Sequence, residues 1–452
     1  MSHKKGMNRR EFVLRTGAGS AAAFLLDSAA EALDLQEPVS PSDRITVGMI
    51  GAGARAQELM QAILEIPGTQ IVAACDAYQG RLTRTQERTK GSAKPYKDYR
   101  EILADKGIDV VVIATPDHWH KAQVVEALEA GKDVYCEKPL TYRVEEGNEI
   151  IAAAKKTGRI LQVGSQGMSS LIQGKAREII QSGKLGQITL LRAFYNRNTA
   201  SGAWIYPIPP DASPETVNWE MFLGPAPKRP YDPARFFRWR CYWDYSGGIA
   251  TDLFVHLCTT IHFLMGAKMP RTVLGAGSLY RWKETHEVPD TVNGIMEYPE
   301  GFTVSLSSTF NNQVTAEGSF QILGTEGSLL LGSNELTFIP ERNNEDNRWI
   351  VESWPTALEK AYYEDPKVRQ AELPNTREPR ALGGTETYRE EGAGATVLHF
   401  RNLFRAVRSR QQPGQDALAG HRAASCAHLV NLSIRQKRAM GWDFTRETVA
   451  RA

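Results

Sequence analysis

Cysteine is scarce in this chain of 452 residues, and its five cysteines stand far apart. Their number is odd, and no two of them form a C-x-x-C pair. A disulfide framework or a zinc ribbon needs paired, regularly spaced cysteines, so the sequence argues against both. We therefore expect five small, buried, apolar side chains, at Cys75, Cys136, Cys241, Cys258 and Cys426.

The chain also lacks an excess of charge of either sign. It carries 54 Lys+Arg against 52 Asp+Glu, a formal charge of +2, and the basic residues are interspersed with acids. Nucleic-acid-binding proteins usually carry a basic stripe, so no nucleic-acid partner is expected. No run of about 18 apolar residues occurs, so no membrane span is expected. The length and a hydrophobic content of 42% are typical of a globular protein of two or three domains.

The N-terminus has the pattern of an export signal. Arg9 and Arg10 are followed by Phe12, by a Gly/Ala-rich apolar run and by small residues at 28–30. This order is typical of the twin-arginine signals that direct folded proteins out of the cytoplasm. The alternative is a short basic arm before an amphipathic helix. We assign residues 1–43 to a twin-arginine signal peptide and linker, and expect a periplasmic location.

Residues 44–165 alternate short apolar runs with helical patterns. Runs of this kind are typical of parallel strands that are buried on both faces. The alternation predicts an α/β fold with an N-terminal Rossmann domain, in which a doubly wound sheet binds a dinucleotide. The apolar runs lie at 45–50, 71–75, 109–114, 134–136 and 160–164.

Residues 166–452 have a different pattern, in which several segments alternate apolar and polar side chains. This predicts an α+β substrate-binding domain with an open, largely antiparallel sheet. The polar, Pro-containing segment 340–390 is expected to form a long loop or lid, and helical spacing over 397–432 predicts C-terminal helices that pack back on the body. The expected strands are 273–280, 292–298, 302–310, 319–323 and 328–331.

The turn after the first apolar run has the sequence Gly-Ala-Gly-Ala-Arg-Ala, a GxGxxA pattern between a strand and a helix. Glycines let the backbone approach a pyrophosphate at the positive end of a helix, and an acid at the end of the next strand binds a ribose hydroxyl. Asp76 has this second position, and its carboxylate would repel a 2′-phosphate. NAD is therefore favoured over NADP, although Arg81 keeps NADP open; the alternative is a structural turn beside an incidental acid. The cofactor-binding candidates here are Gly51, Gly53, Ala54, Arg55 and Asp76.

Two further motifs end neighbouring strands. They are Thr-Pro-Asp-His-Trp-His at 115–120 and Cys-Glu-Lys-Pro-Leu at 136–140. With the GxGxxA turn, they resemble the Gfo/Idh/MocA family, named after glucose-fructose oxidoreductase and inositol dehydrogenase. A Gly-rich turn and D-x-x-x-H helix at 247–256, and a Gly-His pair at 420–421, extend the resemblance over nearly the whole chain after the signal.

The resemblance implies that Lys138 lies beside the nicotinamide and the substrate hydroxyl. A metal site that joins His118 and His120 to His256 is an alternative because imidazole is a common ligand. Two histidines after a cofactor-edge strand fit a nicotinamide pocket better, so no metal is expected. Gln166 has an alternative structural role. The cofactor-binding candidates in these motifs and at the domain junction are Thr115, Pro116, His118, His120, Glu137, Lys138 and Gln166.

The catalytic candidates are Lys138, His256 and Asp252. Oxidation of an alcohol requires a base for the hydroxyl proton and a positive donor for the growing alkoxide. Asp252 and His256 are four residues apart, so an α-helix would place them side by side. We predict that His256 accepts the proton, oriented or charged by Asp252, while Lys138 polarises the substrate oxygen. The opposite division between Lys138 and His256 stays open, and so does a purely structural role for the Asp252–His256 pair.

An aromatic and basic segment at 235–245 supplies the substrate candidates. Aromatic faces stack on sugar rings, and guanidinium groups bind hydroxyls or an acidic substituent. Core packing is the alternative for this segment. The candidates are Arg238, Arg240, Tyr242 and Tyr245.

Export and cofactor use have a joint consequence, because no dissolved nicotinamide pool exists outside the cytoplasm. We expect a tightly held NAD that is recycled in place by an oxidoreductase acting on a carbohydrate or cyclitol hydroxyl. The alternative within the same family is a redox-neutral glycosidase, which oxidises a sugar, eliminates its aglycone and reduces it again. A noncatalytic sensor that holds the cofactor is a third reading. The protein is expected to form a homo-oligomer.

Overall fold

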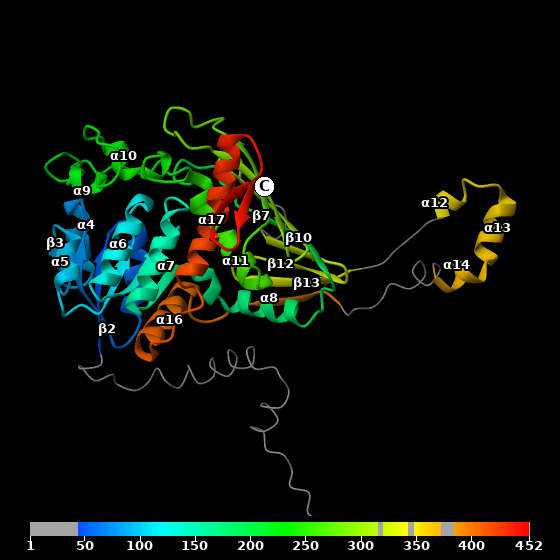
Figure 1. The fold of residues 1–452 in the computed structure, drawn as a ribbon, viewed down its shortest axis with the longest axis horizontal. Helices are drawn as coiled ribbons and strands as arrows, with labels where there is room; N and C mark the ends of the chain where they lie inside the picture. Colours follow the sequence, from blue (N-terminus) through cyan, green and yellow to red (C-terminus); the bar gives the residue numbers. More distant parts are fainter. Residues whose placement is uncertain (1–43, 315–319, 342–347, 372–383, 452) are drawn as a thin grey trace, which may run out of the picture.

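The computed structural model describes residues 44–314, 320–341, 348–371 and 384–451. The export signal predicted at residues 1–43 lies outside the described residues. Within them, no helix is both long enough and apolar enough to cross a membrane. Figure 1 shows two sheet-containing bodies side by side, the first in blue and cyan and the second in green and yellow.

The first body is built on a six-stranded parallel sheet, as the sequence predicts. Its strand order is β3-β2-β1-β4-β5-β6, with β1 at the centre of the two halves. Both faces are covered by helices, which explains why the strands are nearly continuous apolar runs. The strands are β1 (Ile45–Ile50), β2 (Thr69–Cys75), β3 (Lys94–Tyr96), β4 (Val110–Ile113), β5 (Asp133–Glu137) and β6 (Leu161–Gly164).

The helices of this body begin and end at recognisable signals. Asp98 and Glu101 form a capping box at the start of α5, and Gly158 ends α7 in the left-handed conformation. The helices are α3 (Ala54–Leu64), α4 (Gln79–Arg88), α5 (Tyr99–Ala104), α6 (Asp117–Glu129) and α7 (Glu146–Thr157).

The second body contains a ten-stranded sheet in the order β14-β13-β12-β11-β7-β10-β9-β8-β15-β16. Its pairs are antiparallel except β7 with β10, which run parallel with Leu191 opposite Val304. The five strands expected from the sequence are confirmed within one to two residues. The strands are β7 (Ile188–Phe194), β8 (Thr272–Ser278), β9 (Thr291–Tyr298), β10 (Phe302–Thr309), β11 (Phe320–Gly324), β12 (Gly327–Leu331), β13 (Glu335–Pro340), β14 (Glu386–Arg389), β15 (Met440–Asp443) and β16 (Thr448–Arg451).

Helices bury the inner face of this sheet. Alternate residues of β10 are buried against a core to which α11 and α17 contribute, while the intervening threonines and serines are partly exposed. A π-helical turn, η4 (Ala250–Phe254), leads directly into α11. The helices of the second body are η2 (Gln166–Ser169), α8 (Leu171–Gln181), α9 (Trp219–Leu223), α10 (Pro233–Phe237), η3 (Trp239–Cys241), α11 (Val255–Met265) and α17 (Ala417–Gln436).

The C-terminal helices connect the two bodies. The sequence predicts helices over 397–432 that pack back on the body. The helices α16 (Ala395–Ser409) and α17 confirm this prediction. Phe400, Leu403 and Phe404 of α16 belong to the same buried cluster as β1 and α3. Residues assigned from the sequence to the second domain thus complete the core of the first.

The segment 340–390 was expected to be a loop or lid. Its described residues contain three short helices that stand away from both sheets in Figure 1, and the strand β14 at the sheet edge. The helices are α12 (Arg348–Val351), α13 (Thr356–Glu364) and α14 (Pro366–Ala371).

Candidate active site

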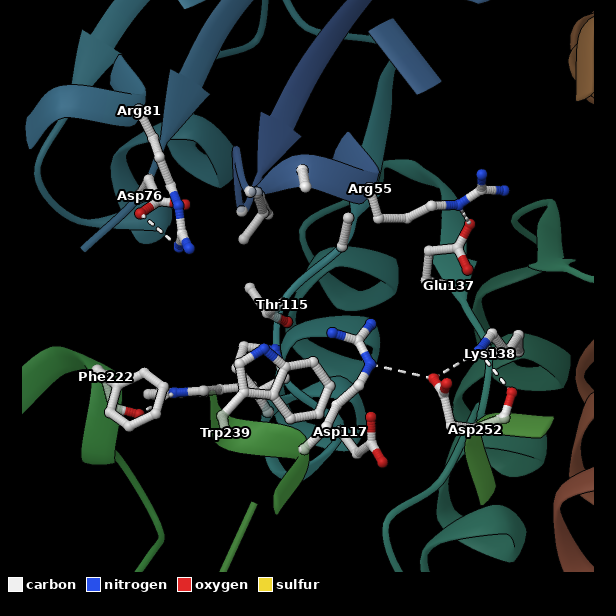
Figure 2. Close-up of a pocket in the computed structure, with 18 of the residues that line it drawn as sticks. Arg55, Asp76, Arg81, Thr115, Asp117, Glu137, Lys138, Phe222, Trp239 and Asp252 are labelled. Carbon is white, nitrogen blue, oxygen red and sulfur yellow. Dashed lines mark hydrogen bonds and ion pairs between the residues drawn. The ribbon is translucent and has the colours of Figure 1, made fainter. Parts of the chain in front are cut away.

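A cavity of about 710 Å³ lies between the two bodies, at the carboxyl ends of β1, β2, β4 and β5. Open parallel sheets bind ligands at this edge, where the strand order reverses. Figure 2 shows that side chains from the Rossmann sheet form the upper wall and that green segments of the second body close the cavity from below.

The GxGxxA turn has the shape that a dinucleotide requires. Gly51 follows β1 with a φ of +86°, and a Cβ there would lie 2.7 Å from the carbonyl oxygen of Ala114. Gly53 is the N-cap of α3, and no side chain caps this helix or places an acid in its first turn. The free N–H groups at the positive end of α3 therefore suit a pyrophosphate.

Asp76 ends β2 beside this turn. Its Oδ2 accepts a hydrogen bond from the N–H of Ala52 at 2.7 Å, and its Oδ1 accepts one from the N–H of Tyr78 at 2.8 Å. Arg81 approaches Asp76 at 3.5 Å, with its guanidinium over the rings of Phe236 and Phe237. Asp76 thus holds the turn and presents a carboxylate where the ribose of a dinucleotide is expected.

Arg55 and Gln166 meet at Glu137. The Glu137 Oε1 accepts hydrogen bonds from Arg55 Nε at 3.1 Å and from Gln166 Nε2 at 2.9 Å. The hydroxyl of Tyr135 also donates to it, at 3.3 Å. Arg55, Glu137 and Gln166 line the cavity, and their network fixes the backbone just before Lys138.

The two histidines of the 115–120 motif have other roles than the one expected. His120 is buried, with its ring nitrogens 2.7 Å from the carbonyl oxygen of Pro139 and 2.9 Å from that of Thr115. It therefore ties the ends of β4 and β5 together. His118 is buried against α9, 3.0 Å from the carbonyl oxygen of Phe222, and burial lowers its pKa to about 4. Thr115 and Pro116 do line the cavity, but neither histidine does.

Lys138 forms the centre of a charged cluster. Its Nζ donates to the Oδ1 and to the carbonyl oxygen of Asp252, both at 2.8 Å, and Arg240 Nε donates to the same Oδ1 at 3.1 Å (Figure 2). Burial alone would raise the pKa of Asp252, but Lys138 and Arg240 hold this pKa well below its usual range. Asp252 is therefore a permanent carboxylate that orients two cations.

His256 lines the same cavity from the first turn of α11. Burial, together with the positive charge of Lys138, lowers its pKa to about 3. The side-by-side contact expected from the spacing is replaced, because the Oδ1 of Asp252 accepts hydrogen bonds from Lys138 and Arg240. In the described chain, no hydrogen bond joins Asp252 to His256. The imidazole is therefore neutral at physiological pH and has a free lone pair, and the same surroundings disfavour its protonated form.

Asp117 is a further acid in the cavity wall, and it was not among the site residues expected from the sequence. It is the first residue of α6 and is only 3% exposed. Burial raises its pKa to about 7, with Arg240 opposing this shift. Its place directly after a strand end, within the 115–120 motif, was the available signal.

The aromatic and basic segment divides between cavity and core. Arg240 and Trp239 line the cavity, whereas Arg238 donates to the carbonyl oxygen of Tyr206 at 2.8 Å and does not. Tyr245 is fully buried against Phe222 and His118, and Tyr242 packs beneath the Arg235 guanidinium. Of the four substrate candidates, Arg238, Arg240, Tyr242 and Tyr245, the structure brings Arg240 into contact with the cavity.

Further cavity residues follow β7, a strand that was not expected from the sequence. Tyr195 and Arg197 follow β7, and Tyr206 lies in the loop after it. No motif marks them in the sequence. In the described part of the chain, no three His, Cys, Asp or Glu side chains form a group that could hold a metal.

The chain matches two models of one protein family. Residues 45–165 match the model described as an oxidoreductase family with an NAD-binding Rossmann fold, and residues 174–330 match the GFO/IDH/MocA C-terminal domain. The residues around Gly51 and Asp76 fit a dinucleotide, and NAD is the cofactor of this domain.

Characterised relatives are oxidoreductases that act on sugars and cyclitols. The chain is 26% identical over 295 residues to 1,5-anhydro-D-fructose reductase of Ensifer adhaerens, covering 65% of this chain and 77% of that protein. It is 26% identical over 309 residues to scyllo-inositol 2-dehydrogenase (NAD(+)) of Bacillus subtilis (strain 168), covering 66% and 77%. Levoglucosan dehydrogenase, solved with NADH and levoglucosan, shares the fold with a TM-score of 0.64 and 19% identity, over 88% of this chain and 99% of that chain.

Proposed function

Because the chain belongs to the GFO/IDH/MocA oxidoreductase family, we propose that it oxidises a hydroxyl group of a carbohydrate or cyclitol and retains its NAD between turnovers. The observation that carries this proposal is that Lys138, bonded to Asp252, and a neutral His256 both line the cavity that holds the dinucleotide turn. Alcohol oxidation needs one donor and one proton acceptor at the same oxygen.

The contacts favour Lys138 as the hydrogen-bond donor and His256 as the proton acceptor over the reverse assignment. Lys138 Nζ donates two hydrogen bonds to Asp252, and a lysine ammonium group has a third N–H that can be donated to a substrate oxygen. His256 is neutral and takes the hydroxyl proton. Asp252 positions Lys138 and Arg240 rather than the imidazole. When bound, NAD supplies the acceptor for the hydride that leaves the carbinol carbon.

Retention of the cofactor is proposed from the expected export of the chain by its twin-arginine signal. A periplasmic enzyme would receive NAD before export and would have to recycle it in the site. The Glu137 network and the Asp76 contacts are the groups that would keep the surrounding backbone ordered between turnovers.

The test begins with the protein as purified. Denaturation followed by mass analysis is expected to release NAD or NADH in near-equal amount to the protein. Addition of candidate sugars and cyclitols to the intact protein should then change the nicotinamide absorbance at once, without added cofactor. A protein that neither contains nor binds a nicotinamide dinucleotide would contradict the proposal.

Asp117 favours a second candidate function, the redox-neutral cleavage of a glycoside. Elimination after oxidation needs a base at carbon and an acid at the leaving oxygen, and this cavity holds a second proton-transfer group whose pKa lies at about 7. Product analysis separates the two functions. A ketosugar or a second reduced sugar supports the oxidoreductase, whereas a free aglycone with no net change in NADH supports the glycosidase.

A further inference from the structure

Positive charge predominates at the Lys138 end of the cavity. Three cations, Lys138, Arg197 and Arg240, line it there, and Asp252 is the carboxylate that pairs with two of them. The paired charges cancel only in part, because one carboxylate faces two cations. The pyrophosphate of NAD cannot supply the balance, because its place is at the N-terminus of α3 beside Asp76.

The neighbouring titratable groups do not supply it either. Burial raises the pKa of Asp117 to about 7, so at neutral pH this carboxyl carries only part of a negative charge. Burial also raises the pKa of Tyr206, whose phenol stays neutral, and it holds His256 in its neutral form. Glu137, next to Lys138 in the chain, forms its ion pair with Arg55 and none with these three cations, so positive charge remains in excess around Lys138, Arg197 and Arg240.

Of these three cations, Arg197 is the one that forms no ion pair with a carboxylate in the described residues. Its guanidinium lies 5.0 Å above the ring of Tyr195, and its Nη1 donates to the carbonyl oxygen of Gly202 at 3.2 Å. A guanidinium has five N–H donors, so most of them remain for a ligand. Among the residues that the structure describes, no carboxylate forms an ion pair with Arg197.

We propose that the substrate is an anionic sugar, whose carboxylate, phosphate or sulfate is bound by Arg197 while Lys138 and His256 act on a hydroxyl. This rests on the proposed function and adds the class of substrate to it. A planar guanidinium that is already held by two rings and one carbonyl suits an oxyanion, because little further ordering is needed on binding. The excess positive charge would also attract such a substrate into the cavity.

The experiment uses the NADH-loaded protein and matched pairs of sugars. Isothermal titration compares methyl glycosides of glucose, galactose and mannose with the corresponding uronides, and each free hexose with its 6-phosphate and 6-sulfate. At least one acidic member is expected to bind ten-fold or more tightly than its neutral partner, and added salt should reduce that preference. Comparison of the uronides, the 6-phosphates and the 6-sulfates shows which oxyanion the protein prefers.

Variants locate the preference. Arg197→Gln should remove the preference for the acidic sugar, because it should weaken binding of that sugar at least ten-fold and binding of the neutral sugar less than three-fold. Arg197→Lys should restore part of the preference. Arg192→Gln is the matched control, because Arg192 is exposed on β7 outside the cavity. Melting temperatures of all three variants show whether the fold is intact.

A panel in which no acidic sugar outbinds its neutral partner overturns the inference, including a panel in which nothing binds. An acid preference that survives in Arg197→Gln overturns the assignment to Arg197. Turnover is recorded separately from binding. Oxidation of neutral sugars without any acid preference leaves the proposed function standing, whereas acid-selective binding with no redox change or product contradicts the proposed function alone.

Discussion

Burial and Lys138 keep His256 neutral, so its lone pair is free for the hydroxyl proton, and the same effects make it a weaker base than a free imidazole. Replacing it by Gln should lower turnover by about 10²–10⁴, the usual loss for a positioned acid–base group. The NAD content should not change, because His256 lies away from the Gly51 turn. Turnover and bound NAD are measured together, with His262→Gln, on the same helix but outside the cavity, as the control. Near-full activity in His256→Gln would assign the proton to Lys138.

Asp117 should make the protein less stable as the pH rises. Its pKa of about 7 in the folded state lies above the value near 3.9 of an unfolded chain, so the folded state binds more protons between these limits. The contribution of this carboxyl is fully present below about pH 4 and is lost as the pH rises to 7.

The variant Asp117→Asn removes this effect. Its melting temperature should exceed that of the parent at pH 8 by more than it does at pH 5. Scanning calorimetry at the two values measures the difference. Equal gains at both pH values would mean that the Asp117 carboxyl has an ordinary pKa.

Several site residues could be predicted because they directly follow apolar runs that become parallel strands. Gly51, Asp76 and Lys138 are of this kind, since the carboxyl ends of such strands meet at one edge. Arg197 could not be predicted, because its approach to Lys138 depends on how the second sheet packs on the first. Tyr245 was expected to contact the substrate but lies in the core. The sequence does not separate these two places, because aromatic side chains occur in cores as well as in sugar-binding sites.

Gly51, in the turn between β1 and α3, has a matched control in Gly91, in the turn between α4 and β3. Gly51 and Gly91 both have positive φ, at +86° and +83°. A Cβ on Gly51 would lie 2.7 Å from a backbone oxygen, whereas a Cβ on Gly91 meets nothing within 4 Å.

Gly51→Ala and Gly91→Ala should each cost about 1 kcal/mol or more of stability, because both force an alanine to positive φ. Only Gly51→Ala should lose NAD as well, because the turn must move to relieve its contact. Urea unfolding and NAD content after purification distinguish the two effects. Equal NAD content in both variants would show that the dinucleotide does not rest on this turn.

The helix that carries Asp252 shows where spacing arguments fail. Four residues separate neighbours on an α-helix, but Ala250–Phe254 form a π-helical turn, which rotates Asp252 relative to His256. The strand β7 was missed for another reason. Leu190 and Leu191 are adjacent apolar residues that break its alternation, and its central place comes from pairing with β10 and β11, more than 100 residues away.

At the scale of the whole molecule, buried histidines predict sensitivity to acid. Burial lowers the pKa of seven of them, and four of these reach low values: about 4 for His118, His399 and His428 and about 3 for His256. The unfolded chain then binds more protons below pH 6.5, so stability falls as the pH falls.

At pH 5 each histidine should cost at most about 2 kcal/mol relative to pH 7.5. The melting temperature should therefore drop by several degrees. His428→Asn should have a smaller drop than the parent, even if its own stability at pH 7.5 is lower. A melting temperature that is constant from pH 7.5 to 5 would contradict neutral buried imidazoles.

The predicted export depends on Arg9 and Arg10. If Arg9 and Arg10 direct the folded chain out of the cytoplasm, the double variant Arg9→Lys, Arg10→Lys should accumulate in the cytoplasm with its NAD bound. Cell fractionation of variant and parent provides the measurement. The same distribution for both would remove the periplasmic assignment and the need to retain the cofactor.

The helix α16 fills the core of the first body although it begins only at Ala395. While the ribosome is still adding the second sheet, the six-stranded sheet lacks Phe400, Leu403 and Phe404 as cover for one of its faces. The nascent chain therefore cannot finish its dinucleotide-binding half until nearly all of it has been synthesised. We therefore expect stable binding of NAD only after α16 has been synthesised and has packed on the first sheet.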